Sequence, residues 1–156
     1  MGTASLPIMH RLLPITFAIG LALCSGSCST GFNRDWNLAA TKNATAPASL
    51  EGAWKGTWLS KVNGHHGELR AVVTAVAGQT PPSDYDFRYH ATYKKILSGG
   101  YTARHHVDAK GGLSGSQDLG RLVGGVFTYE GKVTAKEFRA TYKSSSDHGV
   151  FEMKRP

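Results

Sequence analysis

Two short segments of the chain combine histidines with a carboxylate and could bind a metal ion. His65 and His66 follow an Asn-Gly pair, and Asp147 directly precedes His148. Imidazole and carboxylate groups both bind zinc and other divalent ions. The alternative is structural: Asn-Gly-His-His-Gly forms a turn, and Asp147 caps its own backbone. These four residues are therefore a candidate metal site, and a purely structural role stays open beside it.

A second candidate site consists of aromatic residues, several with polar tips. The candidate ligand-binding residues are Trp54, Trp58, Tyr85, Tyr89, Tyr93, His105, Phe127 and Tyr142. Small residues such as Gly56 and Ala91 alternate with the rings, an arrangement that fills the centre of a β-barrel. The same arrangement can leave a narrow cavity for a small apolar or aromatic molecule. A filled core and a ligand cavity both stay open, and we expect His105 to be a core residue bonded to a neighbouring tyrosine or a backbone group.

Sequence motifs of catalysis are absent. The chain has no Gly-x-Ser-x-Gly elbow, no phosphate-binding glycine loop and no His-Glu-x-x-His helix. No cysteine follows Cys28, so residues 51–156 offer no thiol nucleophile. We predict that the protein is not an enzyme and needs no cofactor, with metal-dependent activity at the histidine-rich turns as the exception.

The first thirty residues predict export. Arg11 precedes an apolar run at 12–23, and small residues follow it, which is the layout of a secretory signal peptide. The run is about 12 residues long, whereas a membrane-spanning helix needs about 20. We expect residues 1–27 to be a signal peptide and the mature protein to reach the cell envelope.

The only two cysteines of the chain end this leader. A bacterial lipoprotein signal ends in a cysteine that is diacylated and becomes the new N-terminus. Cys28 follows Ser-Gly-Ser, and Cys24 follows Leu-Ala-Leu. We predict that Cys28, or alternatively Cys24, is lipidated and anchors the protein to a membrane. Unlipidated periplasmic or secreted protein is the alternative, as is a Cys24–Cys28 disulfide.

The charge of the chain is positive but dispersed. The formal net charge is +7 at pH 7, and the densest basic pairs are Lys94-Lys95 and Lys154-Arg155. A block of lysines and arginines typical of nucleic-acid binding does not occur. We therefore expect a solvated basic surface and no nucleic-acid partner.

The elements that must position these residues are β-strands. Apolar and polar residues alternate most clearly at 84–93, where Tyr85, Phe87 and Tyr89 fall on one face. Strands are predicted at 53–60, 66–76, 84–93, 101–109, 113–118, 122–129, 136–143 and 149–155. Turn residues separate them, among them Asn63-Gly64, Gly99-Gly100 and Glu130-Gly131.

Eight short strands in series predict an all-β, antiparallel up-and-down meander. Closing the meander into an eight-stranded barrel removes both exposed edges, and a two-sheet sandwich is the alternative. In such a barrel alternate connections share one end, which would bring residues 60–66 close to 144–148.

The segment between leader and barrel predicts a tether. A short helix is expected at Phe32–Ala40 with Asn33 as its N-cap, followed by a spacer at 42–49. The predicted organisation is thus a signal peptide at 1–27, a tether at 28–50 and a barrel domain at 51–156.

Glu51-Gly52-Ala53-Trp54 resembles the Gly-x-Trp signature that opens lipocalins and related calycin barrels. The resemblance implies that Trp54 closes the base of the barrel against a basic residue of a late strand, Arg139 or Arg155. It also implies a carrier of a small apolar ligand. The whole chain is similar to a group of uncharacterised bacterial lipoproteins, on Asn63-Gly64-His65, Gly124-Gly125 and Asp147-His148-Gly149. The expected function is an envelope-anchored binding or interaction module.

Overall fold

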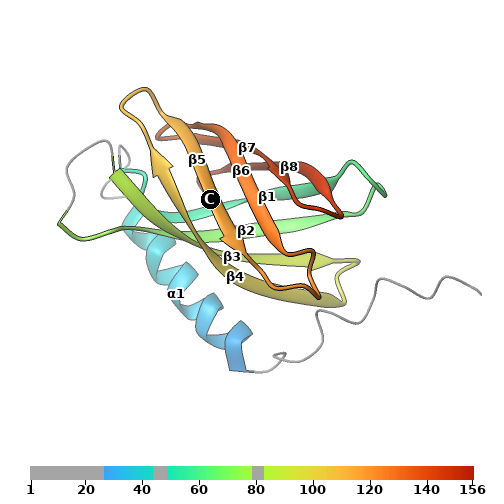
Figure 1. Ribbon diagram of the computed structural model, residues 1–156. Helices are drawn as coiled ribbons and strands as arrows, with labels where there is room; N and C mark the ends of the chain where they lie inside the picture. The colour runs from blue at the N-terminus through green and yellow to red at the C-terminus, as the bar shows by residue number, and fades with distance from the viewer. Residues whose placement is uncertain (1–26, 44–48, 79–82) are drawn as a thin grey trace, which may run out of the picture.

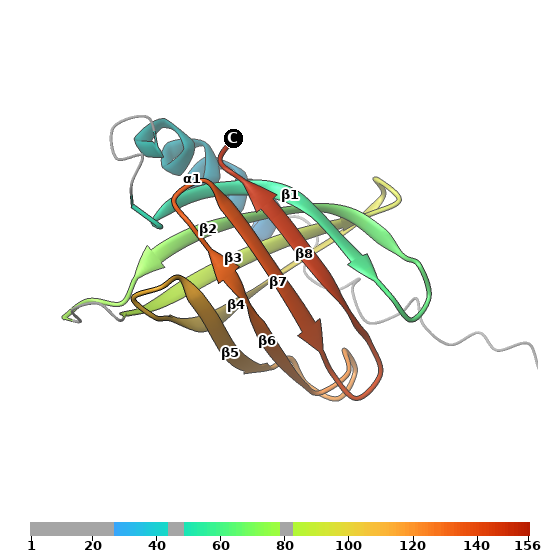
Figure 2. The same ribbon diagram turned by 90° about the horizontal axis from the view of Figure 1, so that it is seen from above.

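The described residues form a closed antiparallel barrel of eight strands with one helix on its outside (Figures 1 and 2). The computed structural model describes residues 27–43, 49–78 and 83–156. The strands are β1 (Gly52–Ser60), β2 (His66–Ala75), β3 (Ser83–Tyr93), β4 (Leu97–Val107), β5 (Gly112–Asp118), β6 (Val126–Val133), β7 (Glu137–Lys143) and β8 (His148–Lys154). Each strand pairs with the next, and β8 pairs with β1. The predicted barrel is confirmed, and the two-sheet alternative is wrong.

Alternation of buried and outward side chains explains why these segments form strands. Inside the barrel, Phe87 and Tyr89 of β3 are fully buried, and Tyr85 and Ala91 pack against the same core. The side chain of His90 points to the opposite face, yet it is buried as well. An outward residue can be buried only where another element covers the barrel, and here that element is the helix.

Two predicted breaks lie inside strands. Gly99-Gly100 belongs to β4, and Glu130-Gly131 belongs to β6, which continues to Val133. A Cβ atom at Gly131 would collide with the carbonyl oxygen of Arg139 on the neighbouring strand β7. This glycine therefore permits a close approach of two strands and does not make a turn.

Trp54 and Arg155 close one end of the barrel, which we call the base. Trp54 is fully buried, its indole N–H donates to the carbonyl oxygen of Leu50 at 3.0 Å, and the guanidinium carbon of Arg155 lies 4.0 Å from its ring centroid. Arg155 also donates to the backbone carbonyls of Ser49, Glu51 and Ala135. The predicted contact of Trp54 with a late basic residue is thus made by Arg155, whereas Arg139 pairs with Glu152 on the surface.

The helix α1 (Ser27–Asn43) is longer than the predicted one and packs along the barrel. It begins five residues before Phe32, and Asn33, predicted as its N-cap, lies inside it and accepts a hydrogen bond from Arg70. The predicted spacer at 42–49 falls mainly on residues 44–48, outside the described residues.

Phe32 is the buried side chain of α1 and packs against the barrel. Its ring is 5% exposed, stacks on the ring of His90 with centroids 4.9 Å apart, and lies 5.3 Å from the guanidinium carbons of both Arg70 and Arg88. One turn later, the indole N–H of Trp36 donates to the carbonyl oxygen of Trp54 at 3.0 Å. The two aromatic side chains lie on one helix face because their spacing is four residues.

The end of α1 is fixed to β1 by a single amide. Asn43 donates to the carbonyl oxygen of Ala53 at 2.8 Å and accepts from its N–H at 3.1 Å. The backbone of Ala53 does not pair with β8, because the β1–β8 pairing starts only at Lys55. The amide side chain of Asn43 takes the place of a neighbouring strand at this residue. The helix is consequently held at the base and runs from there toward the other end of the barrel (Figures 1 and 2).

We expect Arg155→Lys to lower the free energy of unfolding by about 2 kcal/mol, because an ammonium group cannot replace a flat fork of donors over an indole ring. Urea denaturation measures the change. The matched control is Arg139→Lys, whose exposed ion pair contributes at most about 1 kcal/mol. Equal losses in the two variants would contradict the role of Arg155 in closing the base.

Candidate functional site at the rim of the barrel

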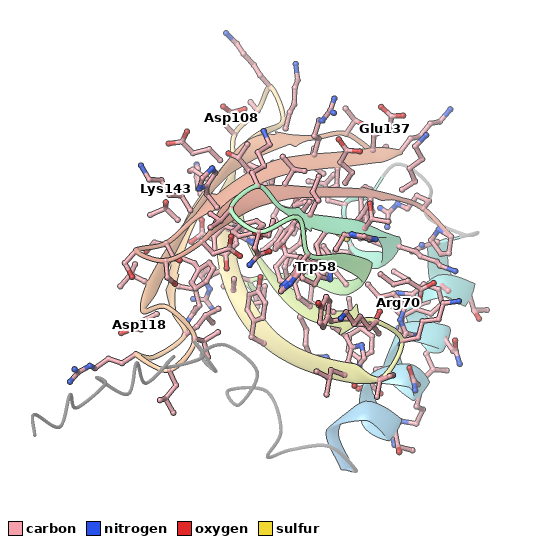
Figure 3. All side chains as sticks on the ribbon, turned by 90° about the vertical axis from the view of Figure 1, so that its right-hand side faces the viewer. Trp58, Arg70, Asp108, Asp118, Glu137 and Lys143 are labelled. Carbon is pink, nitrogen blue, oxygen red and sulfur yellow. The ribbon has the colours of Figure 1, made fainter. Side chains whose placement is uncertain are left out.

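Four connections meet at the end of the barrel opposite the base, and we call this end the rim. It comprises residues 61–65, 94–96, 119–125 and 144–147. All four project on the same side of the barrel in Figure 1, and Figure 3 looks into this end, with Trp58 in its mouth. Alternate connections share one end in an up-and-down barrel, so this grouping follows from the topology.

Side-chain contacts join the first two of these connections. The ring centroids of His65 and Tyr93 lie 4.7 Å apart, and those of Trp58 and Tyr93 lie 6.3 Å apart. The indole N–H of Trp58 donates to the carbonyl oxygen of Thr92 at 2.9 Å. The β1–β2 and β3–β4 hairpins are therefore held together at the mouth of the barrel.

A part-buried carboxylate, that of Asp147, joins the first connection to the last. Ser60, 1% exposed, donates to Asp147 Oδ1 at 2.6 Å, and the Tyr142 hydroxyl donates to Asp147 Oδ2 at 3.1 Å. The Ser145 hydroxyl then donates to the carbonyl oxygen of Gly124 at 2.9 Å, in the β5–β6 connection. All four rim connections are thus linked in one chain of contacts.

The side chains of three of the four candidate metal ligands have other partners at this end of the barrel, and the fourth residue, His148, is exposed. The carboxylate of Asp147 accepts from Ser60 and Tyr142, His65 packs on Tyr93, and His66 Nδ1 lies 3.1 Å from the carbonyl oxygen of Gly64. Across the described ranges, no three His, Cys, Asp or Glu side chains form a group that could hold a metal ion. We predicted that residues 60–66 lie close to residues 144–148. The hydrogen bond from Ser60 to Asp147 joins these two segments, and it holds the fold together instead of binding a metal ion.

The candidate ligand-binding residues divide into two groups. Trp54, Tyr89, His105, Phe127 and Tyr142 are buried, whereas Trp58, Tyr85 and Tyr93 are partly buried. The ring of Trp54 lies 6.4 Å from that of Phe138. The other rings of the first group pack on each other and on Phe87, Tyr129 and Phe151 at centroid separations of 4.8–6.2 Å. The centre of the barrel is therefore filled by its own side chains.

His105 is the polar residue at the centre of this packing. It is fully buried, and its Nε2 lies 3.0 Å from the Tyr89 hydroxyl, which confirms the expected tyrosine partner. Its Nδ1 has no hydrogen-bond partner among the described residues, and its ring makes T-shaped contacts with Phe87 and Tyr129. Burial lowers the pKa of His105 to about 4, because this site cannot solvate an imidazolium.

Large apolar side chains are exposed at the rim. Within the described part of the barrel the exposed ones are Leu59, Val62, Ile96, Leu97, Leu122 and Val126. All six lie in rim connections or within two residues of them. Leu122 and Val123 were predicted to start a strand, but they belong to the β5–β6 connection, since β6 begins at Val126. Because Leu122 was predicted to lie in a strand, the sequence analysis missed that it is exposed at the rim.

Cationic residues directly precede three of these apolar side chains. Lys61 precedes Val62, Lys95 precedes Ile96, and Arg121 precedes Leu122, and all six residues are exposed. Lys94 and Lys143 add two further exposed cations beside the connections. The pairing of one cation with one aliphatic residue is therefore repeated on three of the four rim connections.

Lys94 and Lys95 occupy the left-handed backbone region. Their φ values are 50° and 61°, and the described residues include no other non-glycine residue with positive φ. Hairpin turns that need this conformation favour Asn-Gly or Gly-Gly, since a side chain costs free energy there. Strained backbone of this kind occurs at functional sites, and here it lies beside Ile96, which is 85% exposed.

In comparisons with protein families, with curated proteins and with solved structures, nothing matches the chain. The resemblances to lipocalins and to bacterial lipoproteins therefore stay predictions.

We expect the double variant Lys94→Asn/Lys95→Gly to raise the free energy of unfolding by about 1 kcal/mol, because asparagine and glycine adopt positive φ more readily than lysine. Urea denaturation provides the measurement. The control is Lys110→Gly, at a base turn without positive φ at the changed residue, which should gain nothing. A loss of stability in the double variant would mean that the lysines themselves stabilise the turn.

We expect His105 to make the barrel acid-sensitive. The unfolded chain binds a proton at the ordinary histidine pKa of about 6.5, but the folded chain does so only near 4. The stability from neutral His105 is present above pH 6.5 and declines by about 3 kcal/mol as the pH falls to 4. In His105→Gln this decline should become smaller by about 3 kcal/mol, with the part due to His90 remaining because burial lowers the pKa of His90 as well, whereas His148→Gln, at an exposed position, should keep the full decline. Denaturation curves across this pH range test both.

Proposed function

We propose that the protein is an exported, lipid-anchored envelope protein whose barrel serves as an interaction module and binds through its rim. The observation that supports the rim as the binding surface is the location of the exposed apolar side chains, all at one end of the barrel. Monomeric proteins rarely expose clustered apolar side chains unless they bind something there. The base, by contrast, carries no exposed large apolar side chain among its described residues.

The predicted leader and Cys28 support the anchor. Residues 1–26, which include most of the predicted signal peptide and Cys24, lie outside the described residues, and Cys28 falls in the first turn of α1. Among the described helices, none is long and apolar enough to cross a bilayer. Because α1 packs on the barrel, a lipid on Cys28 would hold the barrel itself next to the membrane, with α1 leading from the base toward the rim.

The interior supports a carrier less well than the rim supports an interaction module. The buried rings contact each other, and His105 is already bonded to Tyr89. The contact of Arg155 with Trp54 supports the resemblance to lipocalins in the way the barrel closes. It does not supply a space for a ligand. We therefore place binding on the outside of the barrel end.

We expect the protein, expressed from its full chain in bacteria, to incorporate a labelled fatty acid. Cys28→Ser should abolish the label, and Cys24→Ser, the matched control, should retain it. Labelled protein is measured after gel separation of the membrane fraction. Label on both variants contradicts the anchor at Cys28. Absence of label from both the wild-type chain and Cys24→Ser contradicts it as well. Either result leaves the rim as a binding surface, which is tested separately below.

A further inference from the structure

We propose that the rim docks on an anionic lipid bilayer, with its aliphatic side chains among the lipid headgroups and its cations on the lipid phosphates. This inference rests on the proposed function only in taking the rim as the binding surface. It does not require the lipid on Cys28, because the contacts belong to the barrel. It gives the barrel a second contact with a membrane besides the predicted anchor.

The apolar part of the rim has the exposure that insertion requires. Ile96 is 85% exposed and Leu122 is 88% exposed, so neither side chain contributes to the core. Val62, 55% exposed, occupies the corresponding position on the β1–β2 connection. An aliphatic side chain gains free energy when it leaves water for the interfacial layer of a bilayer. Each of the three connections therefore has one aliphatic side chain that can enter that layer without any loss of core packing.

The charges of the rim match an anionic surface. Lys61, Lys95 and Arg121 adjoin the three aliphatic side chains, and Lys94 and Lys143 extend the basic surface. Two carboxylates lie among them: Asp147 accepts from Ser60 and Tyr142, and Asp118 accepts from the N–H of Gly120 at 2.8 Å. Both are engaged in holding the connections, and the outward cations outnumber them. Each lysine or arginine near an anionic leaflet contributes about fivefold to partitioning.

The rim is ordered before it meets a partner. The His65–Tyr93 contact, the Ser60–Asp147 hydrogen bond and the Ser145–Gly124 hydrogen bond connect all four segments. Strain at Lys94 and Lys95 also costs stability that an Asn-Gly turn would not. Both features favour a surface whose shape is held for binding, since a preformed site loses little conformational entropy when it binds.

A bilayer fits this surface better than a protein partner does. The centres of protein interfaces are rich in aromatic residues and poor in lysine, whereas the rim carries aliphatic tips beside lysines. Two hollows of the described surface lie away from the rim: one is lined by His106, Asp108, Gly112–Ser114 and Glu130-Gly131, and the other by Glu130–Lys132, Arg139–Thr141 and Val150. Ile96 and Leu122 are 85% and 88% exposed, so their side chains project from the molecule.

Hydrogen exchange of the full-length chain on vesicles tests the proposal. The apolar run at 12–23 can hold the chain on any vesicle, so vesicle binding alone is not the readout. We compare phosphatidylcholine vesicles with vesicles that contain about 30% phosphatidylglycerol, a typical anionic content. The anionic vesicles should slow amide exchange at 61–65, 94–97 and 119–126 by at least about tenfold. Exchange at the base connections 108–111 and 134–136 should not change.

Two triple variants separate the apolar and the charged contributions. Val62→Ser/Ile96→Ser/Leu122→Ser removes the aliphatic tips, and Lys61→Gln/Lys94→Gln/Arg121→Gln removes three cations. Both should lose the protection of the rim, because three cations together account for about 100-fold in partitioning. Lys110→Gln/Lys136→Gln makes matched changes at the base and should keep it. All changed side chains are exposed, and denaturation curves confirm that the variants stay folded.

Each other outcome overturns the proposal in an identifiable way. If the chain sediments with anionic vesicles but the rim segments stay unprotected, the rim does not contact the bilayer. That result does not contradict the proposed anchor. Equal protection on neutral vesicles would exclude recognition of anionic lipid. Protection that grows with protein concentration in the absence of lipid would assign the rim to a second copy of the chain.

Discussion

The pairing of β1 with β8 is the contact on which the rest of the structure depends. It joins Lys55 to Lys154 at one end and Ser60 to Gly149 at the other. Near the first pair, it places Arg155 over Trp54 and closes the base. Near the second, it places Asp147 within reach of the Ser60 hydroxyl and so links the first and last rim connections. Without closure neither end would exist as a unit, since these residues lie far apart in sequence.

Closure also separates the tasks of the two ends and the interior. The base is covered by Arg155 and by the start of β1, to which Asn43 of α1 is bonded. The interior holds aromatic rings around the neutral histidine His105, whose low pKa reflects how little water it meets. The rim remains as the part of the barrel where exposed apolar and cationic side chains cost the core nothing. A surface of this kind can be adapted to a partner without disturbing the packing below it.

Strand periodicity predicted much of the fold. It failed where a glycine or an apolar residue is compatible with both a strand and a loop. The alternation at 84–93 placed Phe87 and Tyr89 inside correctly, because side chains of a strand alternate between its faces. Glu130-Gly131 was wrongly assigned to a turn, since a glycine that permits close strand approach looks the same in sequence as a turn glycine. Leu122 was wrongly assigned to a strand for the parallel reason: an apolar residue in a loop resembles one in a core.

The sequence by itself determined the strand number and the inward aromatic face, because each depends on residues close together in the chain, and on the same ground it predicts a leader that ends near Cys28. Tertiary structure alone decided which side chains meet across the barrel. Only closure shows that Asp147 is occupied by Ser60 and Tyr142, that Phe32 of α1 covers His90, and that three cation–aliphatic pairs share one end. The physical reason is that burial and exposure are properties of the assembled surface. A sequence specifies which side chains could be apolar contacts, and the fold decides which of them are left facing water.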